Sequence, residues 1–420
     1  MTLTPLDAAA ALIVLAAFLG YLNHRLLGLP QAIGLTVMGA AASLLVILID
    51  FVVPYFHLVA TLTAYLAQID FHEALIDGML SFLLFAGALH VDLSELRRNK
   101  WAVATLSTIG VLLSTLIVGA GFRLLAALFG VDLPFAWCLV FGALISPTDP
   151  VAVMGILKNA KVSKSLESTV AGESLFNDGV GLVVFLILVG AAVTDQPISF
   201  AHGAELFIVE AFGGALLGLC VGYLGFIAMR SIDEHNLEVL ISLAMVMGGY
   251  AIAHHIHVSG PIAMAVAGLL IGNHGMKHAV SERTRDHMQK FWSLLDEILN
   301  SALFLLIGLE VVAISTHWSA IAIGLMAIPL VLLARAGSVW PPLAVINIFS
   351  ARLRGSFPIL LWGGLRGGIS IALALSLPAS PMRDVILTAT YIIVVFSVIV
   401  QGGTVGSVAR RVTRRVEAEA

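Results

Sequence analysis

The chain has 420 residues, of which 59% are hydrophobic and only 11% are charged, and its mean hydropathy is +1.01. Soluble domains carry about 25% charged residues, so this composition excludes a soluble fold. The formal net charge of -4 and the scattering of the arginines over short loops also exclude a basic face for nucleic acid, and we expect no nucleic-acid partner.

Apolar runs long enough to cross a hydrocarbon layer of about 30 Å recur along the whole chain. Polar, Gly or Pro breaks divide them into thirteen candidate transmembrane spans: 8–22, 31–50, 76–91, 101–130, 134–157, 168–193, 204–229, 237–255, 259–273, 292–313, 317–349, 357–378 and 385–408. The segment 51–75 is left open between an interfacial helix and a re-entrant segment. We predict an all-α polytopic membrane protein that forms one integral unit over 1–420.

The basic residues are distributed unevenly over the breaks between spans. Of the 22 Lys and Arg residues, 18 lie in breaks that follow odd-numbered spans, and the others are Arg123, Arg335, Arg366 and Arg383. Because cytoplasmic loops attract basic residues, we predict an outer N-terminus and a cytoplasmic C-terminus. We expect a multi-pass protein of a prokaryotic cytoplasmic membrane, with a retained first helix and no soluble regulatory domain.

The fifth span carries a carboxylate between two prolines. In the string FGALISPTDPVAV, Pro147 and Pro150 enclose Thr148 and Asp149. Proline removes a backbone donor and clashes with the preceding turn, so this helix should break at mid-membrane. Unwound backbone is tolerated there where it lines a polar cavity, and transporters bind ions at such breaks. The alternative is a proline kink without a ligand.

The sixth span carries two carboxylates, and a charge near the bilayer centre costs at least about 2.5 kcal/mol. In the string AGESLFNDG, Glu173 and Asn177 share one helical face, and Ser174 and Asp178 share the adjacent one. A carboxylate with a hydroxyl one turn away suits a small cation. Because the same carboxylate can bind a proton instead, competition at Asp178 is sufficient for antiport. The alternative is a helix interface held by polar hydrogen bonds.

The twelfth span contains an arginine among glycines, in the string LWGGLRGGIS. Arg366 needs a counter-charge in hydrocarbon, and a guanidinium pairs best with a carboxylate, so Glu173 is the predicted partner. The flanking glycines, Gly363, Gly364, Gly367 and Gly368, are expected to let neighbouring backbones approach closely.

Histidine and cysteine give weaker indications. His254, His255 and His257 cluster at the end of the eighth span, and His274 and His278 are four residues apart, so a zinc site or a pH sensor is conceivable beside an ordinary surface role. The two cysteines, Cys138 and Cys220, lie inside apolar runs and cannot form a disulfide framework or a cysteine metal site.

Taken together, five strings identify a family resemblance. In chain order they are GALISPTDPVAV, GESLFNDG, SGPIAMAVAGLLIGN, FWSLLDEILNSALFLLIGLE and WGGLRGGIS, and together they resemble the monovalent cation/proton antiporter-1 family, the NhaP and NHE type sodium/proton exchangers. The resemblance implies inverted repeats with discontinuous helices that cross at mid-membrane. It also implies transport helices in about 76–193 and 292–408, with the remaining helices forming a scaffold and homodimer contacts.

The same resemblance implies roles for individual residues. Asp178 would bind the cation and carry the proton, and Ser174 and the Thr148 carbonyl would be oxygen ligands. Asp149 would be a site carboxylate or would support the ligands, and Glu173 and Arg366 would form a structural ion pair. Asn177, which stands where electrogenic relatives have a second aspartate, implies electroneutral one-for-one exchange of Na⁺ for H⁺, without a cofactor.

One departure from the family keeps the choice of cation open. Ala86 stands where several relatives place a third-span glutamate, and His90 and Asp92 do not obviously replace it. A K⁺/H⁺ or broad monovalent cation/H⁺ antiporter is therefore the main alternative. A cation channel would need symmetric rings or repeated filters, and an enzyme is not expected because no HExxH or GxSxG string occurs.

Overall fold

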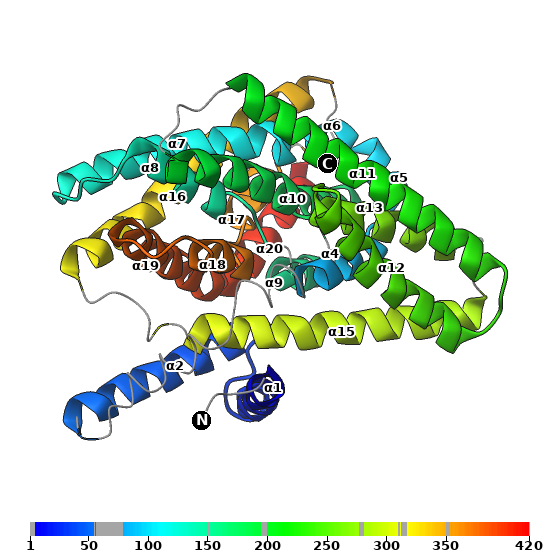
Figure 1. Cartoon of the computed structure of the whole chain (residues 1–420), viewed down its shortest axis with the longest axis horizontal. Coiled ribbons are helices and arrows are strands. Elements are labelled where there is room, and N and C mark those ends of the chain that lie inside the picture. Colours follow the sequence, from blue (N-terminus) through cyan, green and yellow to red (C-terminus); the bar gives the residue numbers. More distant parts are fainter. Residues whose placement is uncertain are drawn as a thin grey trace.

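The computed structural model describes residues 5–53, 55, 79–149, 151–160, 162–194, 200–276, 281–309, 311, 317–349, 353 and 355–419. These residues form a bundle of helices and contain no strand (Figure 1). Most of the unassigned segment 51–75 and the start of the third predicted span lie outside the described residues.

The helices have the following bounds. The longer ones are α1 (Pro5–Leu22), α2 (Gln31–Val52), α7 (Ile109–Leu128), α10 (Lys164–Thr194), α11 (Phe200–Arg230), α12 (His235–His255), α15 (Glu282–Leu309), α16 (Trp318–Phe349), α19 (Pro381–Phe396) and α20 (Gly402–Glu419). The shorter ones are α4 (Leu80–Leu89), α5 (Leu93–Arg98), α6 (Lys100–Ser107), α8 (Phe135–Ile145), α9 (Val151–Asn159), α13 (Gly260–Leu270), α17 (Phe357–Trp362) and α18 (Gly368–Leu375). Three π-helical segments adjoin them, Asn23–Leu27, Ile271–Gly275 and Ser397–Gln401.

The predicted spans correspond to these helices. Within the described residues, nine helical ranges are long and apolar enough to cross a membrane. The third and ninth predicted spans contain the shorter helices α4 and α13, and the fifth and twelfth are each divided into two half-helices. The prediction of an all-α polytopic membrane protein is confirmed.

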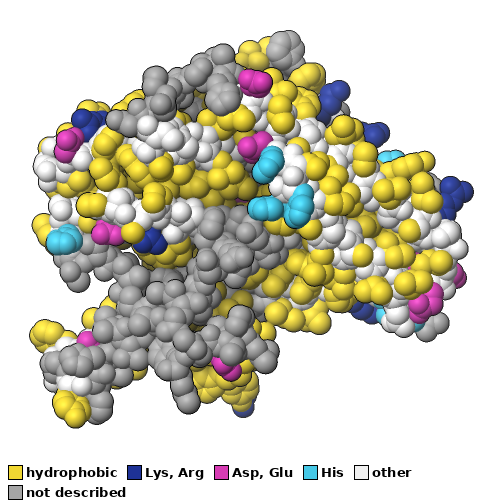
Figure 2. Space-filling view, viewed as in Figure 1, with side chains coloured by type: hydrophobic (Ala, Val, Ile, Leu, Met, Phe, Trp, Pro, Cys, Tyr) yellow, Lys and Arg dark blue, Asp and Glu magenta, His cyan; other side chains and the backbone are white. Residues whose placement is uncertain are grey.

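The outer helices expose large apolar side chains. Val14 on α1 is 66% exposed, Phe212 on α11 is 69% exposed and Leu333 on α16 is 70% exposed. On the face shown in Figure 2, charged side chains are few among the apolar ones. Such a surface is stable against lipid chains, and in water it would be an aggregation hazard.

Helix α10 lies in the middle of the bundle and positions the predicted site (Figure 1). It packs against α8, α6 and α13, among others. Two glycines make this packing possible, because a Cβ at Gly181 would lie 2.4 Å from Cγ of Pro147, and a Cβ at Gly179 would lie 2.4 Å from Cγ1 of Ile262. Small residues of this kind let membrane helices approach closely. The buried polar residues of α10 therefore lie against the break in the fifth span.

Helix α15 is anchored on α2. The Thr36 hydroxyl donates to the Phe304 carbonyl at 3.2 Å, and the Ser43 hydroxyl donates to the Leu309 carbonyl at 2.7 Å. Gly39 and Gly308 meet without side chains between them, since a Cβ at Gly39 would lie 3.1 Å from Cα of Gly308. These contacts hold α15 in one register beside the core.

Candidate functional site

Two unwound segments meet inside the bundle. One lies between α8, which ends at Ile145, and α9, which begins at Val151; the other lies between α17 and α18. The backbone N–H of Asp149 in the first segment donates to the carbonyl of Leu365 in the second at 2.8 Å. The predicted break in the fifth span is thus confirmed, although Pro150 itself lies outside the described residues.

The twelfth predicted span, 357–378, is also divided, in agreement with the predicted fold of discontinuous helices. Helix α17 ends at Trp362, α18 begins at Gly368, and the glycines of the string GGLRGG fill the interval. Glycine costs about 1 kcal/mol relative to alanine in a helix interior, so two glycine pairs around one arginine favour an unwound backbone. The glycines were expected to let neighbouring backbones approach closely, and in the structure they interrupt the helix.

The first segment is held to α10 by a polar network. The Asn177 amide donates to the Thr148 hydroxyl at 2.8 Å, and its carbonyl oxygen accepts from the Thr148 backbone N–H at 3.3 Å. The hydroxyls of Thr148 and Ser174 are 3.1 Å apart. All three side chains are buried. Asn177 therefore satisfies the unwound backbone, and its amide adds no titratable proton.

Asp178 and Asp149 face one cavity. The cavity has a volume of about 580 Å³, and the two carboxylates line it together with Thr148. Asp178 is only 5% exposed and interacts electrostatically with Asp149. Asp149 precedes the first residue of α9, where the positive end of a helix dipole favours a negative charge. Ser174 and Asn177 are buried and are not among the described residues that line the cavity.

Polar residues on the side that the loop charges predict to be cytoplasmic also line the cavity. Its lining there includes His90, Asp92, Glu95, Lys158 and Glu167. The ring of His90 also links α4 to α15, with Nδ1 2.8 Å from the Ala86 carbonyl and Nε2 3.1 Å from the Ser293 hydroxyl. His90 and Asp92 thus line the access route to the site, whereas Ala86 itself is buried outside it.

Arg366 does not form the predicted ion pair with Glu173. Its Nη1 donates to the carbonyl of Pro147 at 2.8 Å and also to the carbonyl of Ser146, and its backbone N–H donates to the Ser397 hydroxyl at 2.9 Å. These carbonyls follow the last residue of α8, where the helix dipole is negative. The direct partners of Arg366 are therefore carbonyls at the end of a half-helix, while Glu173 acts on it electrostatically without a hydrogen bond between them in the described part of the chain.

The partner of Glu173 is Arg335 on α16. Its Nη1 lies 2.5 Å from Oε1 of Glu173, and the two side chains are 8% and 2% exposed. Nη2 of Arg335 also donates to the Leu360 carbonyl, in the last turn of α17, at 3.1 Å. The residue types in a sequence do not reveal which of two arginines from different spans reaches a given carboxylate.

Glycines give these charged side chains room. A Cβ at Gly364 would lie 2.6 Å from Nε of Arg335, and a Cβ at Gly367 would lie 2.4 Å from Oδ2 of Asp149. Both separations are shorter than any normal contact. From the sequence we expected backbones beside these glycines, but in the structure their neighbours are side chains.

One carboxylate of the cavity was not singled out from the sequence. Asp296 on α15 lines the cavity and accepts a hydrogen bond from the Asn300 amide at 3.0 Å. It interacts electrostatically with Asp149. Its position inside an apolar helix was the available signal, because a carboxylate within a membrane span indicates function by default.

The histidine hypotheses receive no support as metal sites. Among the described residues, no group of three or more His, Cys, Asp or Glu side chains is arranged to hold a metal ion. His254 and His255 lie with their ring centroids 6.2 Å apart, outside the lining of the cavity. His278 lies outside the described residues.

The chain is similar to known proteins over nearly its whole length. A family described as "Sodium/hydrogen exchanger, transmembrane" matches residues 13–411. The Na(+)/H(+) antiporter NhaP of Pseudomonas aeruginosa is 46% identical over 411 residues, which cover 97% of each chain. The Na(+)/H(+) antiporter NhaH of Halobacillus aidingensis is 36% identical over 83% of this chain and 85% of its own.

A solved structure has the same fold. The sodium proton antiporter MjNhaP1 from Methanocaldococcus jannaschii superposes with a TM-score of 0.72 and covers 97% of this chain and 98% of its own. At 19% sequence identity this likeness establishes the fold alone.

Proposed function

Because the chain belongs to the transmembrane sodium/hydrogen exchanger family, we propose that it exchanges Na⁺ for H⁺ across the prokaryotic cytoplasmic membrane, with Asp178 as the carrier. The observation that carries this proposal is the position of Asp178. Its side chain is buried and lines a cavity together with Thr148 and Asp149 of the unwound segment and with polar residues of the side predicted to be cytoplasmic. It can be reached by a hydrated ion from that side.

Competition at one carboxylate explains why the exchange is obligatory. A bare carboxylate is costly in a low-dielectric interior, whereas a carboxylate that carries either Na⁺ or H⁺ is neutral. The loaded site can therefore change sides and the empty site cannot. Since Asn177 contributes no proton, the proposed stoichiometry is one Na⁺ for one H⁺. In this scheme Asp149 and the oxygens of Thr148 complete the cation shell, and Ser174 supports Thr148.

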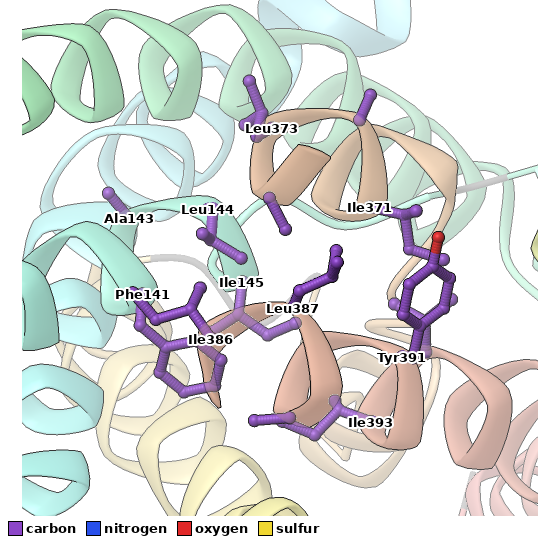
Figure 3. Packing of buried hydrophobic residues seen from close by; sticks show 14 of the residues in the cluster. Phe141, Ala143, Leu144, Ile145, Ile371, Leu373, Ile386, Leu387, Tyr391 and Ile393 are labelled. Atoms are coloured by element: carbon purple, nitrogen blue, oxygen red, sulfur yellow. The ribbon is translucent and has the colours of Figure 1, made fainter. Parts of the chain in front are cut away.

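Alternating access also needs a closed side. Apolar side chains pack tightly between α8, α18 and α19, as Figure 3 shows for Phe141, Leu144, Ile371 and Leu387. The predicted topology places these helices between the site and the outer surface. Ions then reach Asp178 from the cytoplasmic cavity only. Transport requires this apolar layer to part while the cavity closes, and we propose rigid-body movement of the core helices against the remaining ones.

The family resemblance supports a homodimer as the functional unit. Helices α1 and α2 expose apolar residues such as Phe18 and Leu44, which are 57% exposed each. A second copy or lipid can cover them. Native mass spectrometry of the protein in a mild detergent distinguishes a dimer from a monomer covered by lipid, and we expect a dimer.

Exchange is tested by dissipation of a pH gradient in sealed proteoliposomes. Native protein, Asp178→Asn and Asp132→Asn are compared in Na⁺, Li⁺ and K⁺, with the voltage clamped at zero and at about -100 mV. Asp132 is the matched control, because its side chain is 96% exposed and lies far from the cavity lining.

The expected result is Na⁺-driven collapse of the gradient with native protein and with Asp132→Asn, and at least a 100-fold slower rate, about 2.7 kcal/mol, with Asp178→Asn. A voltage-independent rate supports one-for-one exchange. Exchange by Asp178→Asn at the native rate contradicts the assignment of the carrier. Faster collapse in K⁺ than in Na⁺ would instead identify the K⁺/H⁺ alternative.

A further inference from the structure

The cavity contains a carboxylate that this mechanism does not use. Asp149, Asp178 and Asp296 all line it, and Asp296 comes from α15, outside both broken helices and α10. Asp149 interacts electrostatically with each of the other two. Asp92, Glu95 and Glu167 line the cavity as well, so Asp296 adds to a concentration of negative charge, and a structural role alone does not explain its presence.

Asp296 is held in one orientation. The Asn300 amide, one turn along α15, donates both to Oδ1 of Asp296 at 3.0 Å and to its backbone carbonyl at 2.9 Å. Helix α15 is itself fixed on α2. One hydrogen bond to Oδ1 leaves other acceptor positions of this cavity-lining carboxylate for a ligand. The group is thus preorganised to bind a cation.

An oxygen donor in the same cavity has no partner. The side chain of Ser370 on α18 lines the cavity and is 1% exposed, and its hydroxyl makes no hydrogen bond within the described part of the chain. Buried hydroxyls are normally hydrogen-bonded, so this one is explained by a ligand or a water in the cavity. Helix α18 packs against α15, where Leu303 fills the space beside Gly368.

We propose that Asp296, with the Ser370 hydroxyl, forms a second binding site for a monovalent cation, which a cation occupies between the cytoplasm and Asp178. The proposal rests on the proposed function, since it gives that exchanger a two-step access route. A cation at Asp296 neutralises that carboxylate and is available when Asp178 releases its proton. The site also supplies oxygen ligands in a chain whose third span has Ala86 in place of a glutamate.

The transport test uses everted membrane vesicles, whose cytoplasmic face meets the medium. Asp296→Asn keeps the shape of the side chain and removes its charge. Glu297→Gln is the matched control, because Glu297 is the next residue on α15, is exposed and lies outside the cavity lining. The rate of H⁺ exchange is measured against Na⁺ concentration.

Asp296→Asn is expected to raise the half-saturating Na⁺ concentration about tenfold, the factor for one interaction with a charged group, and to leave the maximal rate within about twofold. Ser370→Ala is expected to raise it about twofold, and Asp296→Glu to restore most of the affinity. An unchanged half-saturating concentration overturns the proposal. A complete loss of exchange at saturating Na⁺ also overturns it, since Asp296 would then act as a carrier.

The binding test does not depend on transport. Crystals of Asp178→Asn are soaked in Tl⁺, an electron-dense monovalent cation, and anomalous peaks are compared with those of Asp178→Asn/Asp296→Asn. A peak beside Asp296 in the first protein and its loss in the second are expected, and its absence from both overturns the proposal.

The two proposals can fail separately. If Asp178→Asn still exchanges Na⁺ for H⁺, the carrier has been assigned wrongly, while the Tl⁺ peak at Asp296 still decides the second site. If Asp178→Asn is inactive and no peak lies at Asp296, only the second site is wrong.

Discussion

The two broken helices of this protein have the same backbone arrangement and different chemistry. Both α8 and α17 end inside the bundle, and α9 and α18 continue from there. The first break contains Thr148 and Asp149, whose oxygens face the cavity. The second contains the two glycine pairs and Arg366. One break thus supplies ligands, and the other supplies space and positive charge.

Each break is stabilised by an arginine from a distant part of the chain. Arg366 donates to carbonyls at the end of α8, and Arg335 donates to the Leu360 carbonyl near the end of α17. Half-helix ends inside a membrane leave carbonyls unpaired, and a guanidinium offers several donors in one plane. The difference lies in what else each arginine binds, because only Arg335 forms an ion pair, with Glu173.

The largest effect on stability is expected at this ion pair. Glu173→Gln leaves the buried charge of Arg335 uncompensated and should lower the free energy of unfolding by about 3 kcal/mol. Chemical unfolding in detergent micelles measures it. Glu95→Gln, which removes the exposed pair with Arg98, is the control and should change it by less than about 1 kcal/mol. The pair is unimportant if both variants unfold alike.

Gly367→Ala tests whether the second break supplies space to the first. The added Cβ would lie 2.4 Å from Oδ2 of Asp149, so Asp149 must move, at a cost of about 2 kcal/mol. We expect Na⁺/H⁺ exchange in proteoliposomes to slow at least tenfold, as that energy implies. The control is Gly248→Ala, where no atom lies within 4 Å of the added Cβ. Equal rates in the two variants would show that the glycine is dispensable.

Arg366→Lys tests the bond between the breaks with the charge preserved. A lysine ammonium cannot reproduce the planar guanidinium that now meets the carbonyls of Ser146 and Pro147. One buried carbonyl left without a donor costs about 1 to 2 kcal/mol, to be measured by the same unfolding assay. If Arg366→Lys is as stable as the native protein, charge alone holds the end of α8.

Thr148→Val tests the hydroxyl that links the first break to α10. Valine has nearly the same shape, but the Asn177 amide and the Ser174 hydroxyl lose a hydrogen-bond partner. We expect the free energy of unfolding to fall by about 1 kcal/mol and the half-saturating Na⁺ concentration to rise a few times. If the Na⁺ dependence is unchanged, Thr148 contributes only its backbone carbonyl to the site. Thr148→Ser retains the hydroxyl and is the control.

The smallest effect is expected outside both breaks. His254→Gln, His255→Gln and His257→Asn are combined, since asparagine tolerates the left-handed backbone of His257, with φ 54°. Because these side chains do not line the cavity, the pH dependence of exchange should stay within the error of the native profile. A shift of the profile would restore the hypothesis of a histidine pH sensor.

The local features of the site could be predicted from the sequence. Proline beside Asp149 identified the first break, and the four-residue spacing on α10 placed Asp178 beside the hydroxyl-bearing face. The predicted fold had discontinuous helices, but the second break was not assigned to residues, because glycines within an apolar run also fit a continuous, closely packed helix. Asp296 was missed because it and Glu297 lie within the first turns of the tenth predicted span, where acidic residues resembled the end of a loop.

The sequence was enough to predict an apolar helical bundle and the spans that carry charge, and the orientation in the membrane stays a prediction from the loop charges. These follow from composition and from spacing within one helix, and both are local properties. Only the tertiary structure decided that Arg335 pairs with Glu173 across 162 residues, that Arg366 binds the end of α8, and that Asp296 faces the same cavity as Asp178. A buried charge such as Glu173 has more than one oppositely charged residue in the sequence that could pair with it. The packing of the helices brings one of these residues, Arg335, within hydrogen-bond distance.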